Sequence, residues 1–364
     1  MIRTAPDRNF GRPDMKIAVF GANGYQGKLV VAELARRGIE AVLVGRDPVR
    51  LAQAAASVGL DDAEKRVATV DDHPGLVKAL RGCGAVVNCA GPFTPSGAAV
   101  VRAAITGGSH YVDTAGEQLY IKGVFETFAA AAEAAGVTVV PATTDACLPA
   151  DLLAHLLAAR IGPLDELAGT HVIVGGGGPS RGSLRSVIET IESVRAGGLA
   201  YDDGAWRPGI PARRSAVTLP GEPGATPVAR FPLPEVVTVP RHVAVRHMEG
   251  LAEAEMVERL NSPVPAEVVA SLPEGPSEES RRGQRFTYVL DALGTDGRRA
   301  RGVVRGADTY GTTAAIAAES ACRLVAEPAK AGILAPAQAF DSLDFLEYLA
   351  RRGIRWSIEE QQVG

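Results

Sequence analysis

Three glycines stand at a regular spacing in the segment FGANGYQGKL, at Gly21, Gly24 and Gly27. The segment follows the apolar run KIAVF and precedes a stretch with helical periodicity, which is the context that a phosphate-binding loop requires. Gly21 would let the chain turn off the strand, Gly24 would let a pyrophosphate approach the backbone, and Gly27 would let the helix pack on the sheet. Amides at the helix start would then face the anion. Because the spacing is GxxGxxG rather than GxGxxG, a turn that only packs helix on sheet is the alternative.

The end of the second apolar run indicates which dinucleotide would bind. This run ends in Gly45-Arg46, where many NAD-binding sheets have a carboxylate for the ribose 2′-OH. The guanidinium of Arg46 could pair with a 2′-phosphate, and Gly45 would leave room for it. The sequence therefore predicts NADP(H). NAD(H) is the alternative if Arg46 is only a surface charge and Asp47, expected to cap the next helix, serves the ribose instead.

Small residues after the fourth apolar run, in NCAGPF (88–93), would allow the ribose and nicotinamide to pass close to the backbone. A tight turn, which Gly-Pro would form anyway, is the alternative reading. Side chains inside the glycine loop are also expected to contact the cofactor. The complete set of predicted cofactor-binding residues is Gly21, Asn23, Gly24, Tyr25, Gln26, Gly27, Arg46, Asn88, Ala90, Gly91 and Pro92.

Sequence motifs give weak or no support to a short-chain dehydrogenase mechanism, a serine hydrolase mechanism or a metal site. None of the seven tyrosines is followed four residues later by lysine, so the short-chain dehydrogenase mechanism is not expected. The segment GPSRG around Ser180 matches GxSxG, but Pro179 and the glycines before it fit a strained nucleophile elbow poorly. We expect Ser180 to cap a helix. No HExxH or comparable metal-ligand spacing occurs, so no metal site is predicted.

The elements that must position these residues alternate regularly over the first 160 residues. Apolar runs at 16–20, 41–45, 66–70, 85–91, 110–117 and 137–142 are separated mostly by helical segments. This alternation predicts an α/β fold with a doubly wound parallel sheet. The pattern changes after residue 160, where a helix over 183–195, a strand-like alternation in RHVAVRHMEG and a hairpin over 285–306 predict a mixed, largely antiparallel second domain. A buried, Ala-rich helix is expected over 312–325.

Composition narrows the class of protein. The chain has 364 residues, 46% of them hydrophobic, with a net charge of −4, which gives no reason to expect a nucleic-acid partner. Four cysteines without CxxC spacing read as free thiols in a reducing compartment. The first fourteen residues lack the apolar run of a signal peptide, and no stretch is long enough to span a membrane. We expect a cytoplasmic protein with a small-molecule substrate, and the apolar residues 312–350 leave a homodimer possible.

The order and spacing of GANGYQGKLV, VGRD, VVNCAGPF and GSHYVDTAGE resemble the saccharopine dehydrogenase-like (saccharopine reductase) superfamily, within it the branch of trans-acting enoyl reductases. The resemblance covers about 16–157 and resumes at GADTYG (306–311). It implies a Rossmann-type NADP-binding domain with an inserted mixed α/β (α+β) substrate domain. The expected divisions are a disordered segment at 1–14, the Rossmann domain at 15–160, the substrate domain at 161–306, and helices at 307–364 that return to the Rossmann domain.

The resemblance also implies an NADPH-dependent oxidoreductase that transfers hydride to or from a C=N or activated C=C bond. A dehydrogenase of an amino-acid-derived alcohol or secondary amine is a variant of this reading, and a regulatory dinucleotide-binding protein without turnover is the alternative. TTDACLPADLL (143–153) replaces the segment GFDSxPSD of the enoyl reductase branch, so the substrate stays open.

Three residues are candidates for catalysis, because a nicotinamide carries the hydride and the protein supplies position, charge and a proton. Asp113 and Asp145 follow the fifth and sixth apolar runs, where ligands of such sheets bind, and either could contact substrate. The alternative for each is a helix cap or a structural hydrogen bond. Tyr310, in the returning segment, could donate a proton or act only as a packing aromatic.

Overall fold

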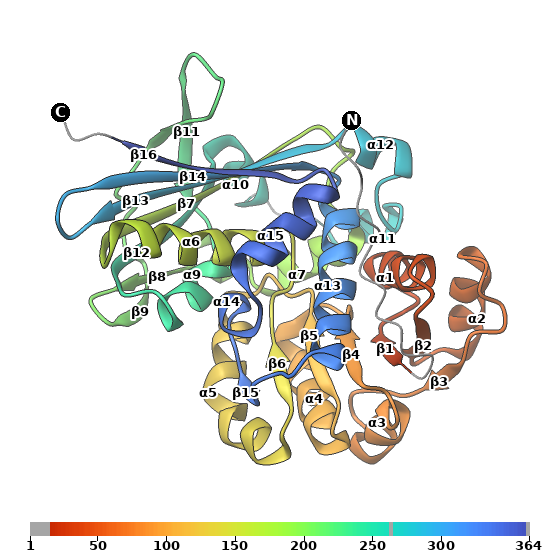
Figure 1. Ribbon diagram of the computed structural model, residues 1–364. Helices are drawn as coiled ribbons and strands as arrows, with labels where there is room; N and C mark the ends of the chain where they lie inside the picture. The colour runs from red at the N-terminus through yellow and green to blue at the C-terminus, as the bar shows by residue number, and fades with distance from the viewer. Residues whose placement is uncertain (1–14, 262–264, 362–364) are drawn as a thin grey trace, which may run out of the picture. The chain divides into compact units, whose positions relative to one another are not determined.

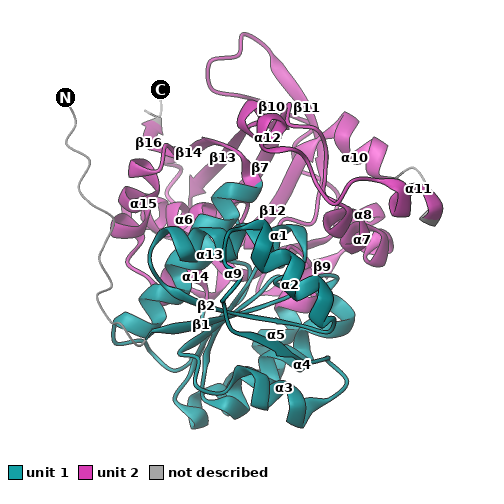
Figure 2. Ribbon diagram, turned by 90° about the vertical axis from the view of Figure 1, so that its right-hand side faces the viewer, with its two compact units in different colours: residues 1–115, 122–144, 310–334 teal, residues 116–121, 145–309, 335–364 magenta. Residues whose placement is uncertain are grey.

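A computed structural model describes residues 15–261 and 265–361 of the chain (Figure 1). The predicted disordered segment 1–14 lies outside the described residues. The chain divides into two compact units, coloured separately in Figure 2. Among the described residues, the first unit comprises Met15–Ala115, Lys122–Thr144 and Tyr310–Leu334, and the second comprises Gly116–Ile121, Asp145–Thr309 and Ala335–Gln361. Each unit is built around its own sheet.

The first unit holds a seven-stranded parallel sheet in the order β15-β6-β5-β4-β1-β2-β3. This order reverses direction between β1 and β4, and such a switch point is where doubly wound sheets bind dinucleotides. The strands are continuous apolar runs because helices cover the sheet on both faces. They are β1 (Lys16–Phe20), β2 (Glu40–Gly45), β3 (Lys65–Val67), β4 (Ala85–Asn88), β5 (His110–Asp113), β6 (Thr138–Val140) and β15 (Gly332–Ile333).

The helices of the first unit begin where the sequence supplies start signals. Asp47 caps α2, accepting hydrogen bonds from the amides of Val49 and Arg50 at 2.9 and 3.1 Å, and Pro48 opens the helix. The predicted Ala-rich helix is α13, which is buried along most of its length. The helices are α1 (Tyr25–Arg36), α2 (Pro48–Ser57), α3 (His73–Leu80), α4 (Phe93–Gly107), α5 (Gln118–Ala135) and α13 (Thr309–Ala326).

The second unit holds a mixed sheet in the order β10-β11-β12-β7-β13-β14-β16, with β8 and β9 attached beside β12. The pair β7–β12 is parallel and the other pairs are antiparallel. The predicted hairpin is β13–β14. The strands are β7 (Leu164–Val174), β8 (Leu199–Asp202), β9 (Ala205–Pro208), β10 (Ala216–Thr218), β11 (Ala225–Arg230), β12 (Val245–Glu253), β13 (Arg285–Gly294), β14 (Arg299–Ala307) and β16 (Arg355–Gln361).

One helix, α6, packs on this sheet with unusual closeness. Gly302 of β14 lacks a side chain, and a Cβ there would lie 2.7 Å from a methyl group of Leu153 in α6. The helices of the second unit are α6 (Leu148–Ile161), α7 (Arg181–Glu189), α8 (Ile191–Arg195), α9 (Glu235–Thr238), the 3-10 turn η1 (Val239–Arg241), α10 (Ala254–Asn261), α11 (Ala266–Ser271), α12 (Glu278–Gly283), α14 (Pro336–Ala339) and α15 (Ser342–Arg351).

The structure confirms the predicted fold class and corrects several boundaries. Residues 145–160, which include most of α6, belong to the second unit, because α6 packs on β13 and β14. Residues 335–361 do not return to the first unit, since β16 extends the second sheet beside β14. The predicted helix over 183–195 is two helices separated at Thr190. The predicted strand at 66–70 ends at Val67, and the strand expected in RHVAVRHMEG begins only at Val245.

Candidate functional site

The glycine loop between β1 and α1 has the conformation that the sequence predicts. Gly21 has a φ of +78°, which favours glycine, and its amide donates to the carbonyl of Val44 at 2.9 Å. A Cβ at Gly21 would lie 2.9 Å from the Cβ of Ala90, closer than side-chain carbons approach in proteins. The loop and the residues after β4 are therefore in direct contact at the switch point of the sheet.

The start of α1 is open to an anion. Gly24 is its N-cap and provides no side-chain hydrogen bond to the helix, so the first amides lack the side-chain cap that α2 has. A Cβ at Gly27 would overlap the carbonyl oxygen of Gly21 and lie 2.8 Å from the Cα of Ala22. On the same helix face as Gly27, the side chains of Val30, Val31 and Leu34 are buried. Gly27 thus holds α1 close to the strand while the helix dipole points at the loop.

The end of β2 presents an exposed guanidinium beside this loop. Arg46 follows Gly45 directly, is exposed, and has no ion-pair or hydrogen-bond partner among residues 15–261 and 265–361. The carboxylate of Asp47 is already engaged as the cap of α2, which argues against its binding a ribose. A Cβ at Gly45 would lie 2.9 Å from Oδ1 of Asn23, so Gly45 makes room for a side chain of the glycine loop.

Buried hydrogen bonds connect the ends of β4 and β5. Asn88 donates from Nδ2 to the hydroxyl of Tyr111 at 3.0 Å and accepts at Oδ1 from the amide of Ala90 at 3.0 Å. The Tyr111 hydroxyl in turn donates to Oδ2 of Asp113 at 3.1 Å. The side chain of Asn88 is fully buried, and its hydrogen bond to the amide of Ala90 fixes the backbone of the predicted cofactor-binding turn. The turn continues through the cis bond between Gly91 and Pro92 into α4.

Asp113 is fully buried rather than exposed in an open cleft. Its Oδ1 accepts hydrogen bonds from the amides of Ala115 and Ala142 at 3.1 and 2.8 Å, and Oδ2 accepts from Tyr111. Its backbone carbonyl accepts from the amide and hydroxyl of Thr143, each at 2.8 Å. This environment favours the structural alternative for Asp113, in which it ties the end of β5 to the segment after β6.

The structure brings Tyr310 to the glycine loop. Its ring stands edge-on to the ring of Tyr25, with the ring centres 5.1 Å apart and the planes at 85°. The amide nitrogen of Gln26 donates to the carbonyl oxygen of Tyr310 at 3.1 Å. Two predicted loop residues thus contact a residue more than 280 positions later in the chain, at the start of α13 within the first unit.

Asp145 lies in the second unit, beside a group of buried polar side chains. Its Oδ2 is 3.9 Å from Nε2 of His171 on β7, and the His171 ring stacks on Tyr288 of β13 at 5.4 Å and 26°. The Tyr288 hydroxyl donates to Oε1 of Glu235 at the start of α9. A Cβ at Gly169 of β7 would lie 2.6 Å from that hydroxyl and 3.0 Å from Oε1, so the missing side chain of Gly169 leaves the space that this pair fills.

Burial decides the charge of this group. Burial raises the pKa of Glu235 to about 8, with a smaller contribution from the nearby charge of Asp151, so its carboxyl group is largely protonated at neutral pH. Burial also lowers the pKa of His171 to about 4, which leaves the imidazole neutral. Burial, together with Glu235, raises the pKa of Tyr288 well above its ordinary value. The three side chains therefore form an uncharged polar cluster.

Ser180 and His242 have structural roles. Ser180 caps α7 by accepting from the amide of Ser183 at 3.1 Å, as expected for a serine that does not act as a nucleophile. His242 follows η1 rather than lying on a strand, with Nε2 3.0 Å from Oδ1 of Asp151. Although burial alone would lower the pKa of His242, this ion pair raises it above its ordinary value.

Sequence reasoning missed His171, Glu235 and Tyr288. Each stands in an ordinary apolar stretch with no spacing that marks it, and Glu235 and Tyr288 are 53 residues apart. Across the described ranges, no group of three or more His, Cys, Asp or Glu side chains is placed to hold a metal ion. No helix in the same ranges is both long and apolar enough to cross a membrane.

The first unit matches a known domain family. Residues 17–140 match the family model of the saccharopine dehydrogenase NADP binding domain. A protein of Mycobacterium tuberculosis (strain ATCC 25618 / H37Rv), whose name proposes a trans-acting enoyl reductase, is 30% identical over 199 residues, which is 52% of this chain and 46% of the relative. A saccharopine dehydrogenase-like oxidoreductase of Mus musculus is 25% identical over 212 residues, 53% of this chain and 45% of the relative. These matches confirm the resemblance, and each spans less than half of the relative.

Among solved structures, the chain resembles the apo, histidine-tagged saccharopine dehydrogenase (L-Glu forming) from Saccharomyces cerevisiae. The TM-score is 0.60 at 13% sequence identity, over 96% of this chain and 100% of that chain. This likeness shows a shared fold. The family match over residues 17–140 identifies NADP(H) as the cofactor of the first unit.

Proposed function

We propose that this chain, whose residues 17–140 belong to the saccharopine dehydrogenase NADP binding domain family, is an NADPH-dependent oxidoreductase acting on a C=N or activated C=C bond of a small metabolite. One observation carries the proposal. The glycine loop presents the uncapped start of α1 next to an unpaired Arg46, while Asp47, the nearest carboxylate in sequence, is used as a helix cap. This is the arrangement that a dinucleotide with a 2′-phosphate needs.

Residues of the first unit would hold the cofactor. The amides at the start of α1 would bind the diphosphate, Arg46 would pair with the 2′-phosphate, and the turn from Ala90 to Pro92 would pass along the ribose and nicotinamide. When bound, the nicotinamide supplies the hydride. Asn88 and Asp113 would act indirectly, because their buried hydrogen bonds fix the backbone of this turn.

Two side chains remain candidates for contact with the substrate. Tyr310 carries a phenol at the glycine loop, and we propose it as the proton donor that accompanies hydride transfer. Asp145 is nearly buried and lies beside the neutral His171, and we propose it as a substrate contact from the second unit. The names of the relatives indicate the two bond types to test, since an enoyl reductase acts on C=C and a saccharopine dehydrogenase-like enzyme on C–N.

The test is NADPH consumption, followed by absorbance, with a panel of cyclic imines and enoyl thioesters. The proposal expects turnover with one class. Tyr310→Phe should lower kcat by about 100-fold while leaving NADPH affinity unchanged, because the lost group acts on the proton. Tyr348→Phe, a matched change in α15, should retain full activity. NADPH binding without turnover on any panel member would support the alternative, a regulatory dinucleotide-binding protein.

A further inference from the structure

A charged cavity of about 340 Å³ lies in the second unit, and none of the residues assigned to the nucleotide lines it. Four guanidinium groups and two carboxylates line it, from three strands and one connecting segment. Glu166 comes from β7, Asp291 from β13, Arg299 and Arg301 from β14, and Arg213 and Arg214 from the segment that precedes β10. The cavity is therefore formed only when these parts of the chain fold together.

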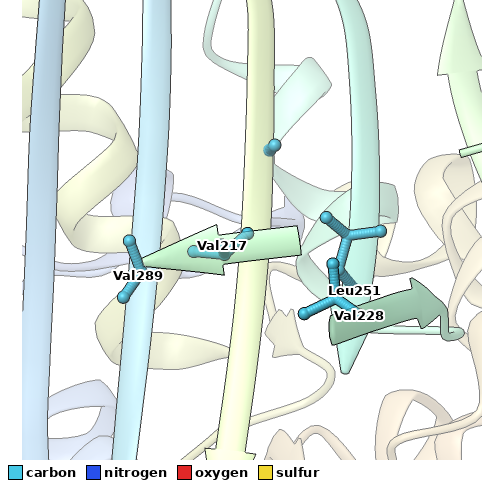
Figure 3. Close-up of a cluster of buried hydrophobic side chains, with 5 residues drawn as sticks. Val217, Val228, Leu251 and Val289 are labelled. Carbon is cyan, nitrogen blue, oxygen red and sulfur yellow. The ribbon is translucent and has the colours of Figure 1, made fainter. Parts of the chain in front are cut away.

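A short segment, residues 213–218, which we call the strap, places Arg213 and Arg214 over the sheet. Residues 213–218 run into β10, and Figure 3 shows β10 crossing the strands of the sheet with Val217 between Val289 of β13 and Leu251 of β12. Val217 is buried in a cluster with Ala168 of β7, Val289 and Leu251 of β12. This apolar anchor fixes the strap on the outer face of the sheet, so the arginines just before it are held rather than free.

The two carboxylates neutralise two of the four guanidinium groups. Arg214 donates to Oε1 of Glu166 from Nε and Nη2 at 3.1 and 2.6 Å, and from Nη1 to Oδ2 of Asp291 at 2.9 Å. Arg301 binds the same Asp291 through Nε and Nη2 at 2.7 and 3.0 Å. Both carboxylates are mostly buried, with side-chain exposures of 15% and 13%. These bonds hold Arg214 and Arg301 in a fixed orientation toward the cavity.

The other two guanidinium groups are not neutralised in this way. Arg213 lies at the longer distances of 3.6 Å from Glu166 and 3.4 Å from Asp202, and Asp202 is itself bound to His247 at 2.9 Å. Arg299 is exposed and has no ion-pair or hydrogen-bond partner in the described part of the chain. Four positive and two negative side chains leave the cavity with a charge of about +2, which attracts anions even though the whole chain is acidic.

We propose that this cavity binds a compact, doubly charged oxyanion, either a phosphate monoester or a dicarboxylate, as a ligand site of the second unit. Planar guanidinium groups match the paired oxygens of both anions, and an ion with two charges balances the charge of the cavity. The volume is near the lower end of small-molecule sites, which fits a ligand of a few heavy atoms rather than a dinucleotide.

Titration calorimetry tests this site in the full chain. Inorganic phosphate is titrated in the presence of saturating NADP⁺, so that the nucleotide site cannot contribute, with succinate and chloride titrated in parallel. Succinate and phosphate distinguish the two ligand sources, and chloride measures nonspecific anion binding. We expect one site for phosphate or succinate, much tighter than for chloride, with an affinity that falls as salt is added.

Single arginine variants locate the site. Arg299→Gln should weaken binding about tenfold, since it removes a charge-assisted partner without breaking an ion pair. Arg213→Gln should weaken binding as well, and it also removes the longer ion pairs to Glu166 and Asp202. Arg298→Gln is the matched control, because it removes the same charge one position earlier, where the side chain binds Asp296 and the carbonyl of Arg160. Phosphate and succinate that bind no better than chloride, or an Arg299→Gln variant that binds like wild type, would overturn the proposal.

Discussion

The two units differ in which polar atoms form their candidate binding sites and polar clusters. In the first unit the key atoms are backbone amides, exposed by glycines within one seven-residue span from Gly21 to Gly27. In the second unit the key atoms are side chains that meet from distant strands, such as Glu235 with Tyr288, or Arg214 with Asp291 across 77 residues. Ligand binding by the first unit therefore depends on glycines that have no side chain. The stability and ligand binding of the second unit depend on the charge and protonation state of its side chains.

This difference separates the expected effects of mutation. A methyl group added to the loop of the first unit should act through sterics and be insensitive to pH. Changes in the second unit should alter how stability or binding depends on pH and salt, because burial there shifts pKa values and leaves charge unbalanced.

The largest effect is expected on the pH dependence of the free energy of unfolding, which the buried Glu235 causes. Its pKa is about 8 in the folded chain against an ordinary value of 4.5, so between these pH values the folded state holds a proton that the unfolded state has lost. This contribution to stability is fully present below pH 4.5 and is lost as pH rises through 8, at up to about 1.4 kcal/mol per pH unit. Urea unfolding of Glu235→Gln between pH 5 and 9 should lack this loss.

The control is Glu267→Gln, an exposed glutamate of α11, which should keep the wild-type pH profile. A Glu235→Gln variant with an unchanged profile would show that the buried carboxyl group is ionised in the folded state.

A smaller loss of stability is expected for Gly27→Ala. The new Cβ would overlap the carbonyl oxygen of Gly21, so α1 must move away from β1 at a cost of about 3 kcal/mol, with weaker NADPH binding. Chemical denaturation and calorimetry measure the two effects. Gly123→Ala in α5 is the matched control, because nothing lies within 4 Å of a Cβ there, and it should be neutral or stabilising. Equal behaviour of the two variants would contradict the packing role of Gly27.

The smallest effect is expected for Asp47→Ala, which removes the cap of α2. The amides of Val49 and Arg50 lose their acceptor, and stability should fall by about 1 kcal/mol. NADPH affinity should change little, because the carboxylate of Asp47 caps α2 and we do not expect it to contact the ribose. Thermal unfolding and calorimetry check both points, with the exposed Asp62→Ala as control. A large loss of NADH binding in Asp47→Ala would instead restore Asp47 as a ribose ligand.

The features that could be predicted from the sequence are those that short-range sequence patterns encode. The strand, glycine loop and helix, the cap at Asp47 and the hairpin of β13 and β14 all rest on short-range signals, and the structure contains them. The role of Gly45 was only partly visible, because its contact with Asn23 depends on two strands lying side by side.

Other features depend on partners that are far apart in sequence. The assignment of α6 to the first unit was wrong because this helix is apolar nearly all round, so no polar face indicates which sheet it covers. Likewise, β16 follows a helix and gives no sign that it pairs with β14. The cluster of Glu235, Tyr288 and His171 joins three elements whose contact is fixed only by the finished sheet.

The central claim is that the first unit selects NADP(H) through Arg46. Titration calorimetry with NADPH and NADH tests it most directly, on wild type, Arg46→Ala and the control Arg50→Ala, an exposed arginine four residues further on. We predict that wild type and Arg50→Ala bind NADPH at least about tenfold more tightly than NADH, and that Arg46→Ala loses this preference while still binding NADH. Equal affinities in wild type, or a preference that survives in Arg46→Ala, would contradict it.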